Sequence, residues 1–194
     1  STSLGKEVKL DVDDSGIELD RTVLDAITDP LLHMLRNAVD HGLETPSERR
    51  EKGKTETGTI RLSASRMGDR VEIYVEDDGR GIDLEAIKTK ALEKRIMTAE
   101  EIAHMSDEEI VGLIGTPGLS TAKTVTDISG RGVGMDVVMT QVKNVGGHVK
   151  ILTTKGSGTS IVLTIPMSLA IIGGLLVNIA HQKYVLPLSS ISTT

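Results

Sequence analysis

Residues 33–42 have the sequence HMLRNAVDHG, and the fold can be predicted outward from this segment. At about 100° per residue in a helix, four polar residues fall on one side, His33, Asn37, Asp40 and His41. The other side carries the apolar residues Leu24, Ile27, Leu31, Leu35 and Ala38. The pattern therefore predicts a helix with an apolar back and a front of imidazole, amide and carboxylate groups.

The polar front suggests ligand binding. Amide and carboxylate oxygens suit a hard cation such as Mg²⁺, which keeps several waters and shares the phosphate oxygens of a substrate. A solvated helix face with histidines present by chance is the alternative interpretation. This segment alone does not separate the two.

The composition excludes several classes of function. The chain has 194 residues with no Phe, Trp or Cys, two Tyr and a net charge of −6. Few aromatic side chains and an acidic balance argue against nucleic-acid binding. The lack of cysteine excludes disulfides and thiolate metal sites. The most apolar run, residues 169–180, is shorter than the about 20 residues of a membrane span. We therefore expect no membrane insertion and a cytoplasmic location.

Periodicity and turn residues predict the elements in chain order. A strand covers residues 6–12, and a helix covers 20–41 with either a kink or a new start at Pro30. Residues 45–58 are expected to form an exposed connection with one helical turn. A hairpin follows at 59–67 and 70–77, then a helix at 83–94. Thr98 and Ser106 each open a short helix, because Glu101 and Glu109 complete capping boxes.

A long loop at 115–130, a helix at 133–145 and a second hairpin at 148–153 and 159–165 complete the pattern. Because the strands mostly come as hairpins, we predict an α+β two-layer sandwich with a mixed, mostly antiparallel sheet and helices on one face. This domain spans residues 1–167. Two further strands, at 171–179 and 183–187, indicate the start of a truncated β domain over 168–194.

Three glycine-rich segments also carry chemistry, DDGRG at 77–81, GRGVG at 130–134 and GSGT at 156–159. Each alone is compatible with an ordinary turn, and neither the P-loop pattern nor the dinucleotide fingerprint is present. Gly132 and Gly134 at a helix start would let backbone N–H groups approach a phosphate. Asp77 at a strand end can accept a hydrogen bond from an exocyclic amine, and Thr159 can add a hydroxyl.

Taken together and in this order, the Asn-bearing helix, DxGxG, GxGxG and GxGT resemble the motif set of the GHKL ATP-binding superfamily. Gyrase, MutL, the heat-shock chaperone ATPases and the histidine kinases share this set. The segments HMLRNAVDHG, VEDDGRGID, TPGLST and SGRGVGMDVV are similar to the catalytic domain of the CheA family of chemotaxis histidine kinases. The similarity covers about residues 5–166 and implies the Bergerat fold, with ATP and Mg²⁺ as its ligands. The tail resembles the start of a CheW-like receptor-coupling domain.

The resemblance implies a role for each matched residue. Asn37 would hold Mg²⁺ between the phosphates, and Asp77 would bind the adenine amine. The implied catalytic residues are His33 and Arg36. The implied nucleotide-binding residues are Asn37, Asp40, His41, Asp77, Gly79, Gly81, Ser120, Thr121, Lys123, Gly130, Arg131, Gly132, Val133, Gly134, Met135 and Thr159.

Two positions depart from the family pattern. His33 stands where hydrolysing members place a Glu. A carboxylate there activates water, whereas an imidazole could polarise an incoming histidine instead. Leu119 stands at a lid position that commonly carries Phe, so we expect looser packing there.

Three functions remain open. The first is a histidine kinase of chemotaxis two-component signalling, which transfers the γ-phosphoryl group of Mg-ATP to a histidine on a separate domain. In the full protein its partners would be that phosphotransfer domain in trans, a dimerisation domain, a coupling protein and chemoreceptors. The second is a MutL- or gyrase-like ATPase used as a conformational switch, and the third is a non-enzymatic scaffold. We expect ATP binding with very slow turnover by this chain alone.

Overall fold

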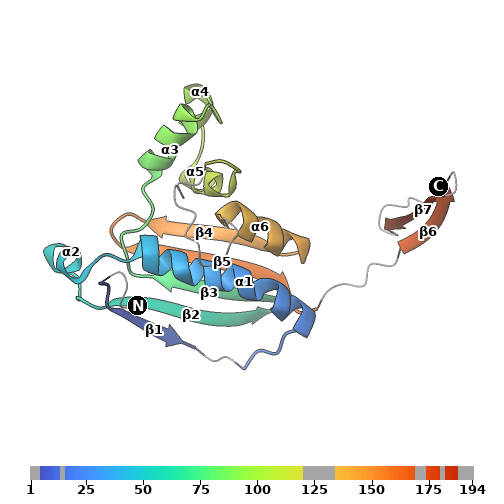
Figure 1. The fold of residues 1–194 in the computed structure, drawn as a ribbon, viewed down its shortest axis with the longest axis horizontal. Helices are drawn as coiled ribbons and strands as arrows, with labels where there is room; N and C mark the ends of the chain where they lie inside the picture. Colours follow the sequence, from blue (N-terminus) through green and yellow to red (C-terminus); the bar gives the residue numbers. More distant parts are fainter. Residues whose placement is uncertain (1–4, 14–15, 120–133, 169–173, 180–181, 188–194) are drawn as a thin grey trace.

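The computed structural model describes residues 5–13, 16–119, 134–168, 174–179 and 182–187. Its main body is a sheet with the strand order β1-β2-β3-β5-β4 (Figure 1). The strands are β1 (Val8–Val12), β2 (Gly58–Met67), β3 (Arg70–Asp77), β4 (His148–Thr154) and β5 (Gly158–Pro166). β1 runs parallel to β2, and the other neighbouring pairs of this sheet are antiparallel. The predicted mixed, mostly antiparallel sheet and both hairpins are confirmed.

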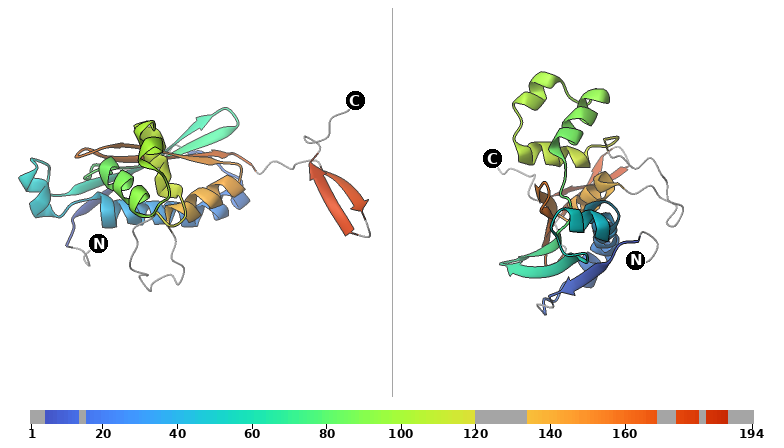
Figure 2. Two further views of the ribbon diagram at one scale, coloured as in Figure 1. Left: turned by 90° about the horizontal axis from the view of Figure 1, so that it is seen from above. Right: turned by 90° about the vertical axis from the view of Figure 1, so that its left-hand side faces the viewer.

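Two helices cover one face of this sheet (Figure 2), α1 (Arg21–Asn37) and α6 (Met135–Asn144). α1 begins at Asp20, whose side chain accepts a hydrogen bond from the backbone N–H of Thr22. It runs through the buried Pro30 without a break, so the predicted alternative of a new helix start is wrong. A single proline removes only one backbone donor, and burial of its ring against the core offsets part of that loss.

The buried stripe of α1 differs from the predicted one. It consists of Val23, Ile27, Pro30 and Met34, and it continues to Ala38 in the next turn. Leu24, which the wheel placed on the apolar back, is 47% exposed. Asn37 follows Met34 by three positions, which is about 60° around the helix. The polar front is therefore a flank of the buried stripe, and its residues His33 and Asn37 are half-buried.

After α1 the chain tightens into η2 (Ala38–Gly42), a single turn of π-helix that the sequence pattern did not indicate. Single π-helical turns are rare and occur often at functional sites. Asp40 and His41 lie in this turn. The chain leaves it through Leu43, which is fully buried.

Four short elements beyond β3 form a second, smaller core. They are α3 (Leu84–Glu93), α4 (Ala99–Ala103), α5 (Asp107–Gly112) and the 3-10 turn η3 (Leu113–Gly115). The predicted capping boxes of α4 and α5 are both present. The buried members of this core are Ile87, Ala91, Ile102, Ile110 and Leu119. Leu119 is only 3% exposed, so the expected looser packing does not hold at that residue.

The strands predicted after residue 168 are present as β6 (Gly174–Ile179) and β7 (Gln182–Pro187), an antiparallel pair that forms its own sheet. The division of the chain into two domains near this point stays a prediction. Among the described residues, none of the helices combines the length and the apolar character that a bilayer crossing requires.

Candidate functional site

Asp77 is the last residue of β3, and its carboxylate is held by the turn that follows. Its Oδ1 accepts a hydrogen bond from the backbone N–H of Gly79 at 2.9 Å. Burial raises the pKa of the Asp77 carboxyl, against the lowering effect of N–H groups of Gly79 and Thr159. The side chain is thus an oriented, partly desolvated acceptor, which suits recognition of an amine.

Three backbone segments converge on Asp77 because glycine allows them to approach closely. A Cβ on Gly79 would lie 2.1 Å from the carbonyl oxygen of Gly42, and one on Gly158 would lie 1.9 Å from that of Asp77. A Cβ on Gly42 would lie 3.0 Å from Oδ2 of Asp77. The end of η2, the turn after β3 and the start of β5 therefore meet around this carboxylate.

Gly81 fixes the far side of the same turn. Its φ is +68°, a conformation that side chains strain to adopt, and a Cβ there would lie 2.3 Å from the carbonyl oxygen of Thr154. The Thr159 hydroxyl lies 3.3 Å from that of Thr153, which accepts from the backbone N–H of Ile82. A pocket of about 370 Å³ opens beside Gly81, and its other lining residues are Lys52, Arg80, Asp83, Lys155 and Gly156.

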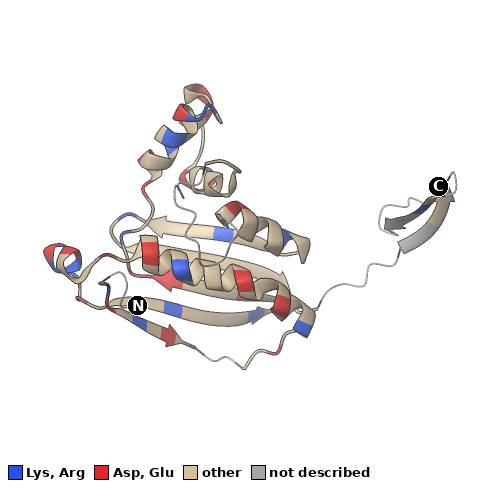
Figure 3. Cartoon of the chain, in the orientation of Figure 1, with Lys and Arg blue, Asp and Glu red and all other residues tan. Residues whose placement is uncertain are grey.

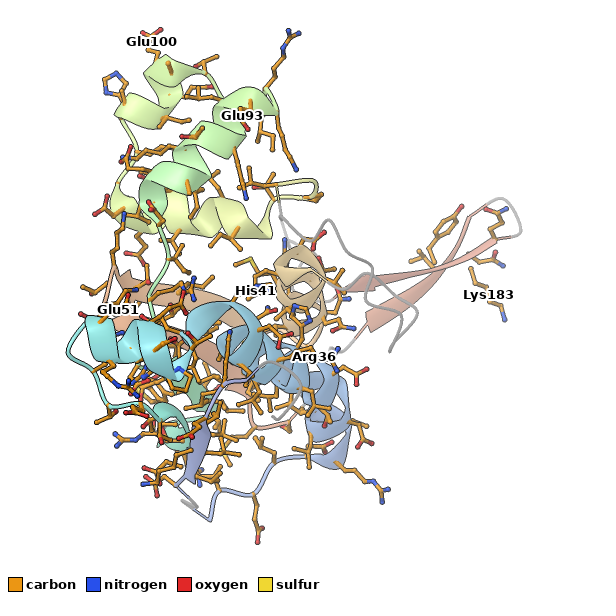
Figure 4. All side chains as sticks on the ribbon, turned by 60° about the vertical axis from the view of Figure 1, so that its left-hand side comes forward. Arg36, His41, Glu51, Glu93, Glu100 and Lys183 are labelled. Carbon is orange, nitrogen blue, oxygen red and sulfur yellow. The ribbon has the colours of Figure 1, made fainter. Side chains whose placement is uncertain are left out.

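The polar residues of α1 and η2 lie near the first turn of α6, which carries Asp136. Burial lowers the pKa of His33, with further lowering by Arg36 and His41, while Asp136 in the first turn of α6 acts in the opposite direction. Arg36 and His41 are exposed, and Figure 4 shows both beside α6. His33 is therefore a neutral imidazole near neutral pH, held where the two helices meet.

The N-terminus of α6 has no side-chain cap. Gly134 occupies the N-cap position and makes no capping hydrogen bond, and Met135 behind it is buried in the main core. The first N–H groups of a helix have no partner within the helix, and the helix dipole favours negative charge there. This end of α6 has the chemistry of a phosphate site.

On the other side of the turn after β3 lies a network of buried charges that the sequence analysis missed. The connection expected at residues 45–58 is largely exposed and contains the expected helical turn as α2 (Pro46–Glu51), with a capping box between Thr45 and Glu48. Arg49 within it is buried, which was not expected. Figure 3 shows both charge signs on α2. Arg49 and Glu44 are each 1% exposed. Arg49 Nη1 and Nη2 donate to Oδ1 and Oδ2 of Asp78 at 3.0 and 2.9 Å.

Two lysines extend these contacts to the backbone. Lys54 Nζ donates to the carbonyl oxygens of Asp78 and Gly79 at 2.9 and 2.6 Å, and to Glu44 at 3.2 Å. Lys6 Nζ donates to the carbonyl oxygens of Val39 and Asp40, both at 2.8 Å. The capping-box pattern at Thr45 could have revealed α2. Nothing local in the sequence could have shown that Arg49 is buried.

The structure therefore brings together Gly42, Asp77, Gly79, Gly81 and Thr159 around one carboxylate. Nearby, it places His33, Arg36, Asn37 and His41 on α1 and η2 and brings this face to Gly134 and Met135 of α6. Asp40 is exposed in η2, with its backbone held by Lys6. The predicted lid residues Ser120, Thr121, Lys123, Gly130, Arg131, Gly132 and Val133 lie outside the described residues. The resemblance implies that Asn37, Asp77 and Gly132 line a common cavity for one nucleotide, and because Gly132 lies outside the described residues this stays a prediction.

Comparison with known proteins identifies the family. The model of the family described as "Histidine kinase-, DNA gyrase B-, and HSP90-like ATPase" matches residues 26–169. The chain belongs to this family. The resemblance inferred from the four motifs is therefore confirmed.

The chain is also similar to several full-length proteins. It is 46% identical to the chemotaxis protein CheA of Halobacterium salinarum, covering 96% of this chain and 28% of that protein. It is 44% identical to the sensor histidine kinase CheAY of Helicobacter pylori, covering 100% of this chain and 24% of that protein. The chain thus spans about a quarter of the length of these relatives. A solved histidine kinase domain from Erythrobacter litoralis matches 82% of this chain and 55% of its own, with 18% identity and a TM-score of 0.49.

Proposed function

We propose that this chain binds Mg-ATP and supplies the γ-phosphoryl group to a histidine on a separate domain. The observation that carries the proposal is the convergence of three segments, which approach closely through Gly42, Gly79 and Gly158, on the half-buried carboxylate of Asp77 beside the polar flank of α1. The family and the similarity to CheA proteins support the same assignment. The tail after residue 168 is proposed as the start of a CheW-like domain.

The geometry suits a nucleotide that lies along α1 and η2. Asp77 would accept a hydrogen bond from the adenine amine, with Gly79 and Gly81 allowing the ring to lie against backbone. Asn37 directly precedes the single π-helical turn that ends at Gly42. The phosphates would then lie near Asn37 and the uncapped start of α6. Thr159 would contribute a hydroxyl close to the base.

The residues on the phosphate side fit Mg²⁺. Asn37 offers one hard oxygen donor from a half-buried position, and the described residues contain no group of three or more His, Asp or Glu able to hold a metal. Mg²⁺ requires few protein ligands, because it keeps several waters and shares phosphate oxygens with its substrate. When bound, it would neutralise phosphate charge, while Asn37 orients the triphosphate.

His33 favours transfer to a histidine over hydrolysis. Its pKa is lowered by burial, so near neutral pH it is uncharged and can hydrogen-bond an incoming imidazole. In the reaction, the bond between the γ-phosphorus and the β–γ bridging oxygen breaks and a nitrogen–phosphorus bond forms, leaving ADP. Phosphoryl transfer depends mainly on positioning and charge neutralisation. In hydrolysing members of the family pattern a Glu carboxylate at this position activates water, and position 33 of this chain carries no carboxylate.

The wider setting follows from the relatives. We propose a role in chemotaxis two-component signalling, in the cytoplasm at receptor arrays. The partners would be a phosphoacceptor histidine domain in trans, a dimerisation domain, a coupling protein and chemoreceptors.

The test compares two reactions of γ-labelled ATP. The chain is mixed with a phosphoacceptor domain from a chemotaxis kinase, and label on histidine and free phosphate are both measured. We expect labelled histidine and very slow phosphate release. Fast hydrolysis without transfer would instead support the switch ATPase, and His33→Glu should raise hydrolysis if position 33 decides between the two. A lack of ATP binding would leave only the scaffold function.

A further inference from the structure

The buried charge network beneath the turn after β3 serves no evident purpose in a stable core. Replacing buried ion pairs by well-packed apolar residues is often neutral or stabilising. Here three cations, Arg49, Lys52 and Lys54, share two carboxylates, Glu44 and Asp78. Because burying Arg49 and Glu44 costs free energy of folding, we look for a role of this network other than stability.

Its contacts are directed at the backbone of one turn. Arg49 Nη1 donates to the carbonyl oxygen of Asp78 at 3.2 Å as well as to its carboxylate. Lys54 donates to the next two carbonyl oxygens, of Asp78 and Gly79. Oδ1 of Asp78 also accepts from the backbone N–H of Thr59 at 2.9 Å. The network thus holds the turn to both α2 and β2.

The opposite side of the same turn makes the candidate adenine site. The N–H of Gly79 donates to Asp77, and the N–H of Arg80 donates to the carbonyl oxygen of Gly42 at 2.8 Å. The carbonyl groups of Asp78 and Gly79 therefore face Arg49 and Lys54. The N–H groups of Gly79 and Arg80 face the opposite way, toward Asp77 and η2. If the turn shifted where it contacts Arg49 and Lys54, the Asp77 carboxylate on its opposite side would move as well.

Arg49 also makes hydrogen bonds to residues outside the turn. Its Nε donates to the carbonyl oxygen of Thr55 at 2.6 Å, and its Nη1 lies 3.4 Å from Glu44 Oε2. The guanidinium is planar and donates through a rigid fork. Lysine at this position would keep the charge but lose the paired contact with Asp78.

We propose that Arg49 and Lys54 are positioning residues for adenine recognition, which they support by fixing the turn that presents Asp77. The inference rests on the proposed function, because it assigns Asp77 to the adenine amine. Neither residue touches the nucleotide, so both act through Asp78 and Gly79. Base selectivity depends on the direction in which the Asp77 carboxylate points. Guanine carries an oxygen where adenine carries the amine, and a displaced Asp77 would discriminate between them less well.

The test measures ATP and GTP affinities by calorimetry for the parent chain and for Arg49→Lys, Lys54→Gln and Arg50→Gln. Arg50 is the matched control, because it is a cation on the same helix α2 but donates to Glu56 at the surface, at 2.8 Å. We expect Arg49→Lys and Lys54→Gln to weaken ATP binding about tenfold or more and to narrow the preference for ATP over GTP. Arg50→Gln should match the parent in both affinities.

Each other outcome overturns the inference. Folded variants with the parent's affinities would show that the network does not position the turn. Equal losses of affinity for ATP and GTP would indicate general damage to the fold, and an equal loss in Arg50→Gln would indicate an effect of charge alone. The side chain of Lys54 is 18% exposed and that of Arg49 is 1% exposed, so Lys54→Gln disturbs the core less. If Arg49→Lys does not fold, the affinities of Lys54→Gln test the inference. A parent chain without a preference for ATP overturns the proposed function itself, which the parent's titration reveals separately.

Discussion

The backbone N–H of Arg80 donates to the carbonyl oxygen of Gly42 at 2.8 Å, and this bond joins two segments that lie far apart in the sequence. Gly42 ends the π-helical turn that carries Asp40 and His41, and Arg80 belongs to the turn that presents Asp77. The bond therefore fixes the polar flank of α1 relative to the half-buried carboxylate of Asp77. The predictions below follow from this arrangement.

Gly79→Ala should separate the two segments. The added Cβ would lie 2.1 Å from the carbonyl oxygen of Gly42, which is backbone and can move only with η2. Such overpacking costs about 1–3 kcal/mol. We expect a lower melting temperature and at least tenfold weaker ATP binding (about 1.4 kcal/mol), measured by thermal unfolding and calorimetry. Gly112→Ala is the control, because a Cβ there meets nothing within 4 Å, and it should neither lower the melting temperature nor weaken ATP binding.

Asp77→Asn should weaken ATP binding while the fold remains. An amide can present a donor where the adenine amine needs an acceptor, and a lost hydrogen bond to a charged group costs about 1.5–3 kcal/mol. The pKa of Asp77 is raised by burial, so the ionised carboxylate contributes no stability above that pKa. The variant should therefore melt no lower than the parent at neutral pH. Parent-like ATP affinity would refute the role of Asp77, and Asp25→Asn, whose side chain is 71% exposed, is the control.

His33 should make the fold sensitive to mild acid. Its pKa is lowered by burial from an ordinary value of 6.5, so the unfolded chain binds the proton first as the pH falls. Stability should therefore decline below pH 6.5, until the folded state is protonated as well. His33→Gln removes this group, and its melting temperature should fall less over the same range. His104→Gln, at an exposed position that ends α4, should follow the parent. If the melting temperatures of His33→Gln and the parent depend on pH in the same way, His33 is not the source of the acid sensitivity.

Glu44→Gln should destabilise the fold. Its carboxylate is fully buried and accepts from Lys52 and Lys54. Burial raises the pKa of Glu44, but these hydrogen bonds outweigh it and keep the pKa below its ordinary value. Removing one partner of a buried charge network costs about 3–5 kcal/mol. Urea unfolding checks this, with Glu56→Gln as control, since Glu56 is exposed and pairs with Arg50 at the surface.

Features set by local sequence were predicted well. The capping boxes at Thr98 and Ser106, the glycine turn between β2 and β3 and the alternation of the hairpin strands depend on residues a few positions apart. Asp77 could be proposed as a binding residue because it stands where a strand ends beside two glycines. The order of the four motifs then indicated the family.

Features set by distant contacts were missed. Arg49 pairs with Asp78, which lies 29 positions away, so its burial has no local signal. The exposure of Leu24 follows from the way α1 lies on the sheet, because several residues around this helix are apolar and only packing selects the buried stripe. Lys6, which precedes β1, likewise donates to two carbonyl oxygens of the π-helical turn from far away in the sequence.

The most direct test of the account is a calorimetric titration of this chain with ATP and with GTP in the presence of Mg²⁺, repeated with Asp77→Asn. We expect saturable one-to-one binding of ATP to the parent chain and a clear preference for ATP over GTP. The folded Asp77→Asn variant should lose that preference. Absence of ATP binding to the folded parent chain, or equal ATP affinity of parent and variant, would contradict the account.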